Sequence, residues 1–136
     1  MDKVVAITGA GKGLGRAYAI HFAELGARII VNNRRHKGEA SSSADETVSQ
    51  ILSRGGTATA EYSRVEDPTA GQRLLDCALD AYGRLDVIVA NAGVSENRSF
   101  VKQSLQEFHD IIDINLLGTA NVLQPAFQYF YAQRRG

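Results

Sequence analysis

Cysteine and net charge are both scarce in this 136-residue sequence, and each absence excludes a class of protein. The single cysteine, Cys77, cannot form an internal disulfide, which argues against a small secreted scaffold and favours a reducing compartment. Lys and Arg number 15 and so do Asp and Glu, so the chain lacks the positive field with which nucleic-acid and membrane-surface binders collect phosphates. No apolar run approaches the roughly 20 residues that cross a bilayer, and the first residues lack a signal peptide's layout. These absences predict a globular cytoplasmic protein without a nucleic-acid or membrane partner, and the length favours one domain.

Metal-ligand patterns are lacking as well. The histidines, His21, His36 and His109, lie far apart in the sequence and show no ligand spacing with Cys77 or with a pair of carboxylates. We therefore expect no metal site, and we interpret Cys77 as a packed helix residue rather than a nucleophile.

The sequence does have a regular alternation between short apolar runs and longer stretches with helical spacing. The short runs predict strands at residues 4–8, 27–32, 57–62 and 85–90. The first run is apolar on both faces, as a strand covered by helices on both sides requires, and the third is less apolar, which is typical of a sheet edge. The stretches between and after them predict helices, the fifth of which has no strand after it. This alternation is typical of βαβ units and predicts an α/β protein with a parallel sheet.

Residues that favour helix ends indicate where the helices start and stop. A first helix over 13–25 should end at Gly26 in the position after its C-cap. Ser43–Glu46 and Ser104–Glu107 both have the Ser-x-x-Glu spacing of a capping box. Asp67-Pro68 offers an N-cap followed by proline at the first helical position. In the last helical stretch, which runs toward residue 134, Pro125 should cause a kink.

A glycine-rich string at the turn from the first strand into the first helix gives the strongest indication of function. It consists of Thr8, Gly9, Ala10, Gly11, Lys12, Gly13, Leu14 and Gly15. Glycines at such a turn let the backbone bend sharply and let a pyrophosphate approach the helix N-terminus, where free amides and the helix dipole favour negative charge. The alternative is a flexible surface turn, but the strand–turn–helix context favours dinucleotide binding.

The spacing of this string resembles the T-G-x-x-x-G-x-G fingerprint of classical short-chain dehydrogenases/reductases. Two further segments match that family: Asn91-Ala92-Gly93 after the fourth strand, and Asn115 within Asp113–Gly118. The motifs stand in the family's order, and the resemblance covers essentially the whole chain. It implies a Rossmann-type doubly wound parallel sheet with strand order 3-2-1-4, truncated after the fifth helix. Residues 1–136 would then be a single dinucleotide-binding domain, incomplete relative to the family.

The resemblance also implies roles for individual residues. In the glycine-rich string the implied cofactor contacts are Thr8, Gly9, Gly11, Lys12, Gly13, Leu14 and Gly15. Asn91, Ala92 and Gly93 would contact the adenosine half of the cofactor and support the central sheet. Asn115 is similar in role to the catalytic asparagine that holds a proton-relay water.

Asn115 also stands out by its position on a predicted helix. Phe108, Ile111, Ile112 and Asn115 follow the spacing of one helix face, so an amide would lie on an apolar stripe. A buried amide without hydrogen-bond partners costs about 1–3 kcal/mol. The alternative to the catalytic role is that this side chain bonds a neighbouring backbone group and only stabilises the fold.

The residues after the second strand bear on the choice of cofactor. NAD-selective Rossmann folds carry an acidic residue roughly 20 positions past the glycine motif, where it bonds the ribose 2′-hydroxyl. Here that region contains Asn33, Arg34 and Arg35 and no carboxylate, and the arginines offer forked donors suited to a phosphate. Lys12 resembles a second basic position of NADP-preferring family members. We therefore expect NADP(H) in preference to NAD(H), the alternative being a solvated basic loop.

The segment after the third strand departs from the family. Arg64-Val65 stands where the family usually carries Asp-Val. An arginine cannot accept a hydrogen bond from the adenine amino group, although it can stack on the ring. We include both residues among the predicted cofactor contacts.

The tyrosine and lysine that transfer the proton in this family have no counterpart in the sequence. The chemistry needs a tyrosine whose pKa is lowered by a lysine four residues later. None of the five tyrosines has a lysine at that spacing, and the family places the pair on elements that would follow Gly136. We therefore assign no catalytic tyrosine or lysine.

These observations predict an NAD(P)-dependent oxidoreductase that interconverts a hydroxyl and a carbonyl on a small substrate. This chain would supply the cofactor-binding half, and the missing residues argue against catalysis by the 136-residue chain alone. Residues 13–19 resemble the hydroxyacyl-thioester dehydrogenase branch. The alternative is a non-catalytic nucleotide-binding or oligomerising protein. The apolar fourth strand would present an unpaired edge, which a second copy or the last helix would cover, or which would aggregate.

Overall fold

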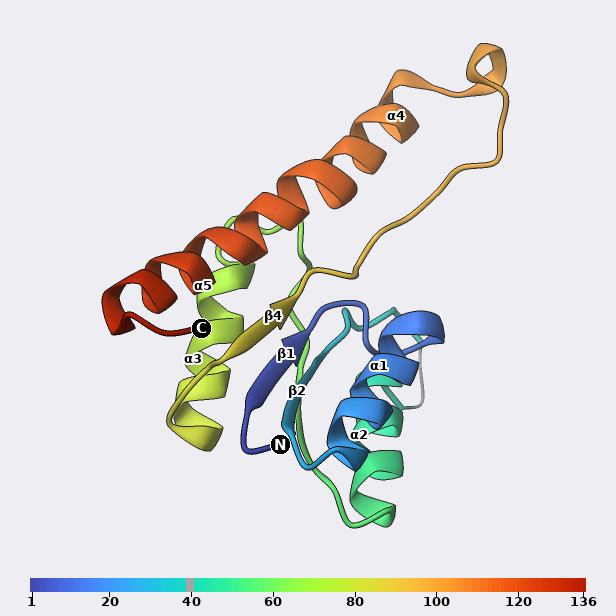
Figure 1. Ribbon diagram of the computed structural model, residues 1–136. Helices are drawn as coiled ribbons and strands as arrows, with labels where there is room; N and C mark the ends of the chain where they lie inside the picture. The colour runs from blue at the N-terminus through green and yellow to red at the C-terminus, as the bar shows by residue number, and fades with distance from the viewer. Residues whose placement is uncertain (39–40) are drawn as a thin grey trace.

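The computed structural model describes residues 1–38 and 41–136, which form a parallel sheet between layers of helices (Figure 1). The strands are β1 (Val4–Ile7), β2 (Arg28–Asn32), β3 (Thr57–Glu61) and β4 (Val87–Val89). The helices are α1 (Gly13–Glu24), α2 (Ser43–Ser53), α3 (Ala70–Tyr82), α4 (Leu105–Ile112) and α5 (Gly118–Gln133), with a 3₁₀ turn η1 (Phe100–Lys102) and a π-helical segment η2 (Asp113–Leu117). Within the described residues the strand order is β3-β2-β1-β4 and every pair is parallel. The predicted fold class and strand order 3-2-1-4 are therefore confirmed.

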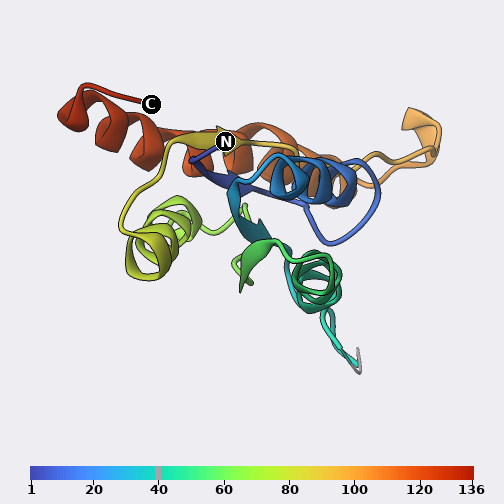
Figure 2. The same cartoon turned by 60° about the horizontal axis from the view of Figure 1, so that its bottom comes forward.

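The core lies on both faces of the sheet because successive side chains of a strand point to opposite faces. All four residues of β1 are fully buried. Val4 and Ala6 pack into one apolar cluster, and Val5 and Ile7 pack into another. The first cluster also holds Leu74 and Ala78 of α3 and Val122 and Ala126 of α5, and the second also holds Ala19 of α1 and Ile51 of α2. Figure 2 accordingly shows α3 and α5 on one side of the sheet and α1 and α2 on the other.

Helix α5 packs closely against α3 at Gly71. A Cβ atom at this position would lie 2.1 Å from the carbonyl oxygen of Asn121 and 3.0 Å from Cγ of Pro125. Pro125 has no N–H to donate to the carbonyl four residues earlier, which is that of Asn121. Helix α5 continues through Pro125, and the π-helical segment η2 precedes it; the kink expected at Pro125 stays a prediction.

Two of the predicted helix ends are confirmed. Gly26 follows the C-cap of α1 with a φ of +86°, a conformation that glycine adopts without strain. Ser104 and Glu107 form the expected capping box at the start of α4, since the hydroxyl accepts from the Glu107 amide and the carboxylate accepts from the Ser104 amide. Local hydrogen bonding between neighbouring residues is enough to fix both ends.

The starts of α2 and α3 were predicted wrongly. The N-cap of α2 is Ser42 rather than Ser43, because the Ser42 hydroxyl accepts from the amide of Asp45. Helix α3 begins at Ala70, and the Asp67 carboxylate accepts from an amide two residues later, closing a turn rather than capping the helix. At α2 the neighbouring serines compete for the cap, and the hydroxyl of Ser43 instead accepts from the Asn33 side chain.

Helix α4 and the segment before it project beyond the ends of the strands (Figure 1). Phe108 and Ile112 are 41% and 37% exposed, and Asn115 is exposed as well. The prediction of a buried stripe on this helix was therefore wrong. Helical spacing indicates which face of a helix is apolar, but the contact of Phe108 with the Phe100 ring of η1 leaves this face partly exposed.

Strand β4 lies at one edge of the sheet. Among the described residues it pairs only with β1, and Val87, Ile88 and Val89 are all partly exposed. Ile88 packs against the cluster that contains Val122 of α5, so helix packing covers a face of the strand. The backbone edge on the side away from β1 carries no described strand, as the sequence predicts.

Candidate cofactor-binding site

The glycine turn lies directly after β1, at the carboxyl end of the parallel strands. Gly9 has a φ of +64°, and a Cβ atom there would lie 2.9 Å from Cα of Ala92. A Cβ atom at Gly15 would lie 2.4 Å from the carbonyl oxygen of Gly9 and 2.6 Å from the side-chain nitrogen of Asn91. Only glycine fits at these two positions, so α1 starts in close contact with the turn and with the end of β4.

Hydrogen bonds connect the glycine turn to the segment after β4. The buried hydroxyl of Thr8 accepts from the backbone amides of Asn91, at 3.1 Å, and Ala92, at 3.0 Å. The side chain of Asn91 donates to the carbonyl of Thr8 at 3.0 Å. Two motifs that are about 80 residues apart in the sequence are thereby held side by side.

Asn115 holds the segment that follows Gly93. Its side-chain oxygen accepts from the amide of Val94 and its side-chain nitrogen donates to the carbonyl of Val94, both at 2.8 Å. The side-chain amide of Asn115, which lies in η2, therefore forms with Val94 the pair of hydrogen bonds that the backbone of a neighbouring strand would form. This is the backbone bonding that the sequence left open as the alternative to catalysis.

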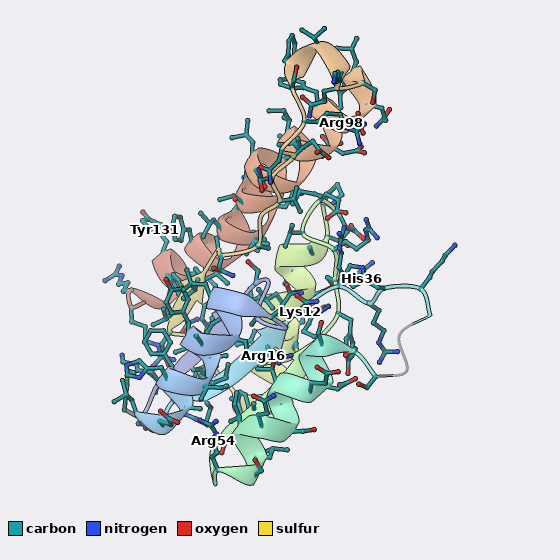
Figure 3. The ribbon with its side chains drawn as sticks, turned by 90° about the vertical axis from the view of Figure 1, so that its right-hand side faces the viewer. Lys12, Arg16, His36, Arg54, Arg98 and Tyr131 are labelled. Carbon is teal, nitrogen blue, oxygen red and sulfur yellow. The ribbon has the colours of Figure 1, made fainter. Side chains whose placement is uncertain are left out.

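A cavity of about 350 Å³ opens beside the glycine turn. The predicted site residues that line it are Gly9, Lys12, Gly13, Leu14, Gly15, Asn33, Arg34, Val65, Asn91, Ala92 and Gly93. Thr8, Gly11, Arg64 and Asn115 do not line it and contact the residues that do. The cavity is also lined by residues that were not predicted: Asn32, His36, Ser63, Glu66, Val94 and Ile114. Figure 3 shows Lys12 and His36 near each other, from the turn and from the loop after β2.

The two arginines after β2 take different positions. Arg34 lines the cavity, with a guanidinium nitrogen 3.9 Å from a carboxylate oxygen of Glu66. Arg35 does not line it, and its guanidinium lies over the Tyr62 ring, 4.0 Å from the ring centre. The Tyr62 hydroxyl donates to the carboxylate of Asp45. This hydrogen bond lowers the pKa of Asp45 and raises the pKa of Tyr62. Arg35 therefore anchors the loop that carries Arg34.

Thr47 of α2 bonds to the backbone of the glycine turn, and this role was not predicted from the sequence. It is fully buried, and its hydroxyl lies 3.1 Å from the carbonyl oxygens of both Ala10 and Ser43. The same hydroxyl accepts from the guanidinium of Arg16 at 3.0 Å. The sequence contains one indication of this role, because Thr47 falls on the stripe formed by Ala44 and Ile51 and is polar where its neighbours are apolar.

Two classes of site find no support in the described residues. They contain no group of three or more His, Cys, Asp or Glu side chains able to hold a metal ion. Burial raises the pKa of the Cys77 thiol, which disfavours the nucleophilic thiolate.

No described helix is both long and apolar enough to cross a membrane.

The parallel sheet and the glycine turn after β1 define an α/β protein of the Rossmann type. The family model for short chain dehydrogenases matches residues 3–136. The chain belongs to the short-chain dehydrogenase family, whose members are oxidoreductases, and the resemblance noted in the sequence is confirmed.

Individual relatives agree with the family assignment. The chain is 44% identical to the peroxisomal multifunctional enzyme type 2 of Mus musculus, over 98% of this chain and 18% of that protein. It is 37% identical to the peroxisomal hydratase-dehydrogenase-epimerase of Saccharomyces cerevisiae, over 99% of this chain and 15% of that protein. The crystal structure of a short chain dehydrogenase from Mycobacterium avium superposes with a TM-score of 0.91 at 35% identity, over 97% of this chain and 47% of that one. The chain thus spans less than half the length of each.

Proposed function

We propose that this chain forms the cofactor-binding part of an NAD(P)-dependent oxidoreductase that interconverts a hydroxyl and a carbonyl. The observation that carries the proposal is the cavity at the glycine turn. It lies outside the carboxyl ends of β1 and β4, where the strand order reverses and open parallel sheets bind their ligands. A nicotinamide dinucleotide, when bound, supplies or accepts the hydride of such a reaction.

The residues at the turn fit a dinucleotide. A Cβ atom at Gly13, the first residue of α1, would meet no atom within 4 Å, so the space over the helix N-terminus is open. The amides at that end favour a negative charge, as a pyrophosphate provides. Lys12 precedes the helix and lines the same cavity, which adds a positive charge there.

We propose that the cofactor is NADP(H) in preference to NAD(H). Asn33 stands at the end of β2 in place of a carboxylate that would repel a 2′-phosphate, and its side chain donates to the Ser43 hydroxyl at 2.8 Å. Arg34 lines the cavity beside it and offers the forked donors that match a phosphate. Arg64, paired with Glu66 next to the cavity, is the residue proposed to stack on the adenine.

The role of Asn115 in the reaction is also a proposal. Its backbone-like pairing with Val94 fixes the chain segment that leaves the cavity after Gly93. A positioning role of this kind is compatible with a proton-relay water bound nearby. The substrate is proposed to be a small hydroxyl or carbonyl compound, with a hydroxyacyl thioester as the first class to test.

A thermal-shift titration of the purified chain with NADP(H) and NAD(H) tests the proposal. We expect stabilisation by both cofactors and a lower dissociation constant for NADP(H). The isolated chain should bind without turnover, because it lacks a tyrosine–lysine pair. A folded sample that neither cofactor stabilises would refute the cofactor assignment and favour the alternative, a non-catalytic or oligomerising protein. We also propose that a second copy covers the edge of β4, and sedimentation of the same sample tests for this homo-oligomer. The cytoplasmic location stays a prediction, and the names of the peroxisomal relatives supply the competing location.

A further inference from the structure

Among the described residues that line the cavity, Glu66 is the one acidic side chain. It lies in the turn between β3 and α3, with its side chain 22% exposed. Both Nε and a terminal nitrogen of Arg64 lie 2.8 Å from one Glu66 oxygen, and Arg34 lies 3.9 Å from that same oxygen. Two guanidinium groups therefore converge on a single carboxylate oxygen at the wall where the adenosine end of a dinucleotide would bind.

These two contacts differ in strength. The contact with Arg64 is a charge-assisted hydrogen bond, whereas 3.9 Å exceeds hydrogen-bond distance, so Arg34 is held to Glu66 by charge alone. A phosphate entering the cavity could draw Arg34 toward itself without breaking a hydrogen bond to Glu66. The carboxylate, however, would remain fixed by Arg64 and would face the incoming phosphate.

We propose that Glu66 is a specificity-determining residue that limits the preference for a 2′-phosphorylated dinucleotide over its 2′-hydroxyl counterpart. The inference rests on the proposed function. Glu66 neutralises part of the charge on Arg34 and Arg64 and repels a phosphate dianion directly, and both effects weaken NADP(H) binding. A ribose 2′-hydroxyl carries no charge and is not repelled, so NAD(H) keeps its affinity.

The variant Glu66→Gln tests this proposal, because it removes the charge and keeps the size of the side chain. Isothermal titration would compare NADP⁺ with NAD⁺, and 2′,5′-ADP with 5′-AMP, a pair that differs only in the 2′-phosphate. We expect NADP⁺ and 2′,5′-ADP to bind at least about three-fold more tightly to the variant, with NAD⁺ and 5′-AMP changed by less than about two-fold. The gain should shrink at about 0.5 M salt, since the groups are partly exposed.

Glu24→Gln is the matched control. Glu24 forms an ion pair with Arg54 at 2.9 Å and lies at the opposite end of α1 from the glycine turn, so it makes the same change in net charge away from the cavity. Figure 3 shows Arg54 well apart from Lys12 and His36. This control should leave the ratio of the two dissociation constants as in the parent chain.

The outcomes separate the two proposals. If the folded parent chain binds neither dinucleotide, the proposed function fails and this inference fails with it. If the parent chain binds and Glu66→Gln leaves the ratio unchanged, or weakens NADP⁺, then only the role assigned to Glu66 is overturned. A weakened affinity for NADP⁺ would mean that the carboxylate positions Arg34 rather than competing with the phosphate.

Discussion

Thr47 offers the sharpest test of how the glycine turn is held in place. Its hydroxyl is fully buried between the carbonyls of Ala10 and Ser43 and accepts from the Arg16 guanidinium. Thr47→Val keeps the shape of the side chain and removes the hydroxyl. A neutral hydrogen bond contributes about 1 kcal/mol, and one from a charged donor contributes about 1.5–3 kcal/mol. Because the Arg16 side chain is 24% exposed and water can replace its partner, we take the lower value and expect a loss of about 2–3 kcal/mol.

Urea unfolding measures this loss, and Thr47→Ser is the control. The serine variant keeps the hydroxyl and loses one buried methyl group, which costs about 1 kcal/mol. The valine variant should therefore be the less stable of the two. If Thr47→Val costs less than about 1 kcal/mol and no more than Thr47→Ser, the hydroxyl does not hold the turn, and the reasoning fails.

Cofactor binding gives Thr47→Val a second readout. If ordering the loosened turn costs about 1 kcal/mol on binding, the dissociation constant for NADP(H) rises about five-fold. A valine variant that is destabilised but binds like the parent chain would show that Thr47 stabilises the fold without positioning the turn.

Three other changes test the remaining contacts. Gly15→Ala places a Cβ atom 2.4 Å from a carbonyl oxygen of the turn, so we expect a loss of about 1–3 kcal/mol in urea unfolding and weaker NADP(H) binding in a titration. Arg34→Gln should reduce the NADP(H)-to-NAD(H) affinity ratio about ten-fold, whereas Arg35→Gln, outside the cavity, should change that ratio far less in the same titration. Burial would raise the pKa of Asp86, but hydrogen bonds from Arg84 and from the Val4 amide, with the nearby positive charges of Arg84 and Lys3, together outweigh it and hold that pKa below its usual value. The ionised carboxylate thus stabilises the fold at pH values above the unfolded-state pKa of about 4. This stability is lost as the pH falls through the lower pKa of the folded state. Asp86→Asn should therefore cost about 1–3 kcal/mol near neutral pH and little at the acid end of a urea–pH series.

Local patterns in the sequence predicted the sheet well. Consecutive apolar residues in β1 indicate burial on both faces, and the glycines after it indicate a tight turn, so both features can be recognised from a few neighbouring residues. The stripe on α4 was misjudged because spacing shows that Phe108 and Ile112 share a face but not whether another element covers that face. The cap of α2 was misplaced by one residue because adjacent serines have the same local preference.

Contacts between distant segments could not be predicted. Arg34 and Arg35 are adjacent and chemically alike, yet one lines the cavity and the other lies on the Tyr62 ring. Their difference follows from the position of Tyr62, which is set by the pairing of β3 with β2. A sequence motif can therefore place two arginines in one loop without indicating which of them lines the cavity.

The start of α2 connects the parts of the candidate site that the sequence motifs treat separately. Ser43 accepts from the side chain of Asn33, Asp45 accepts from the Tyr62 hydroxyl, and Thr47 lies against the carbonyl of Ala10. One helical turn thus contacts the glycine turn, the loop after β2 and the end of β3. A shift of this turn would therefore move the glycine turn and the loop after β2 together, since α2 contacts both. Although no residue of α2 belongs to the family fingerprint, its first turn holds the geometry on which that fingerprint depends.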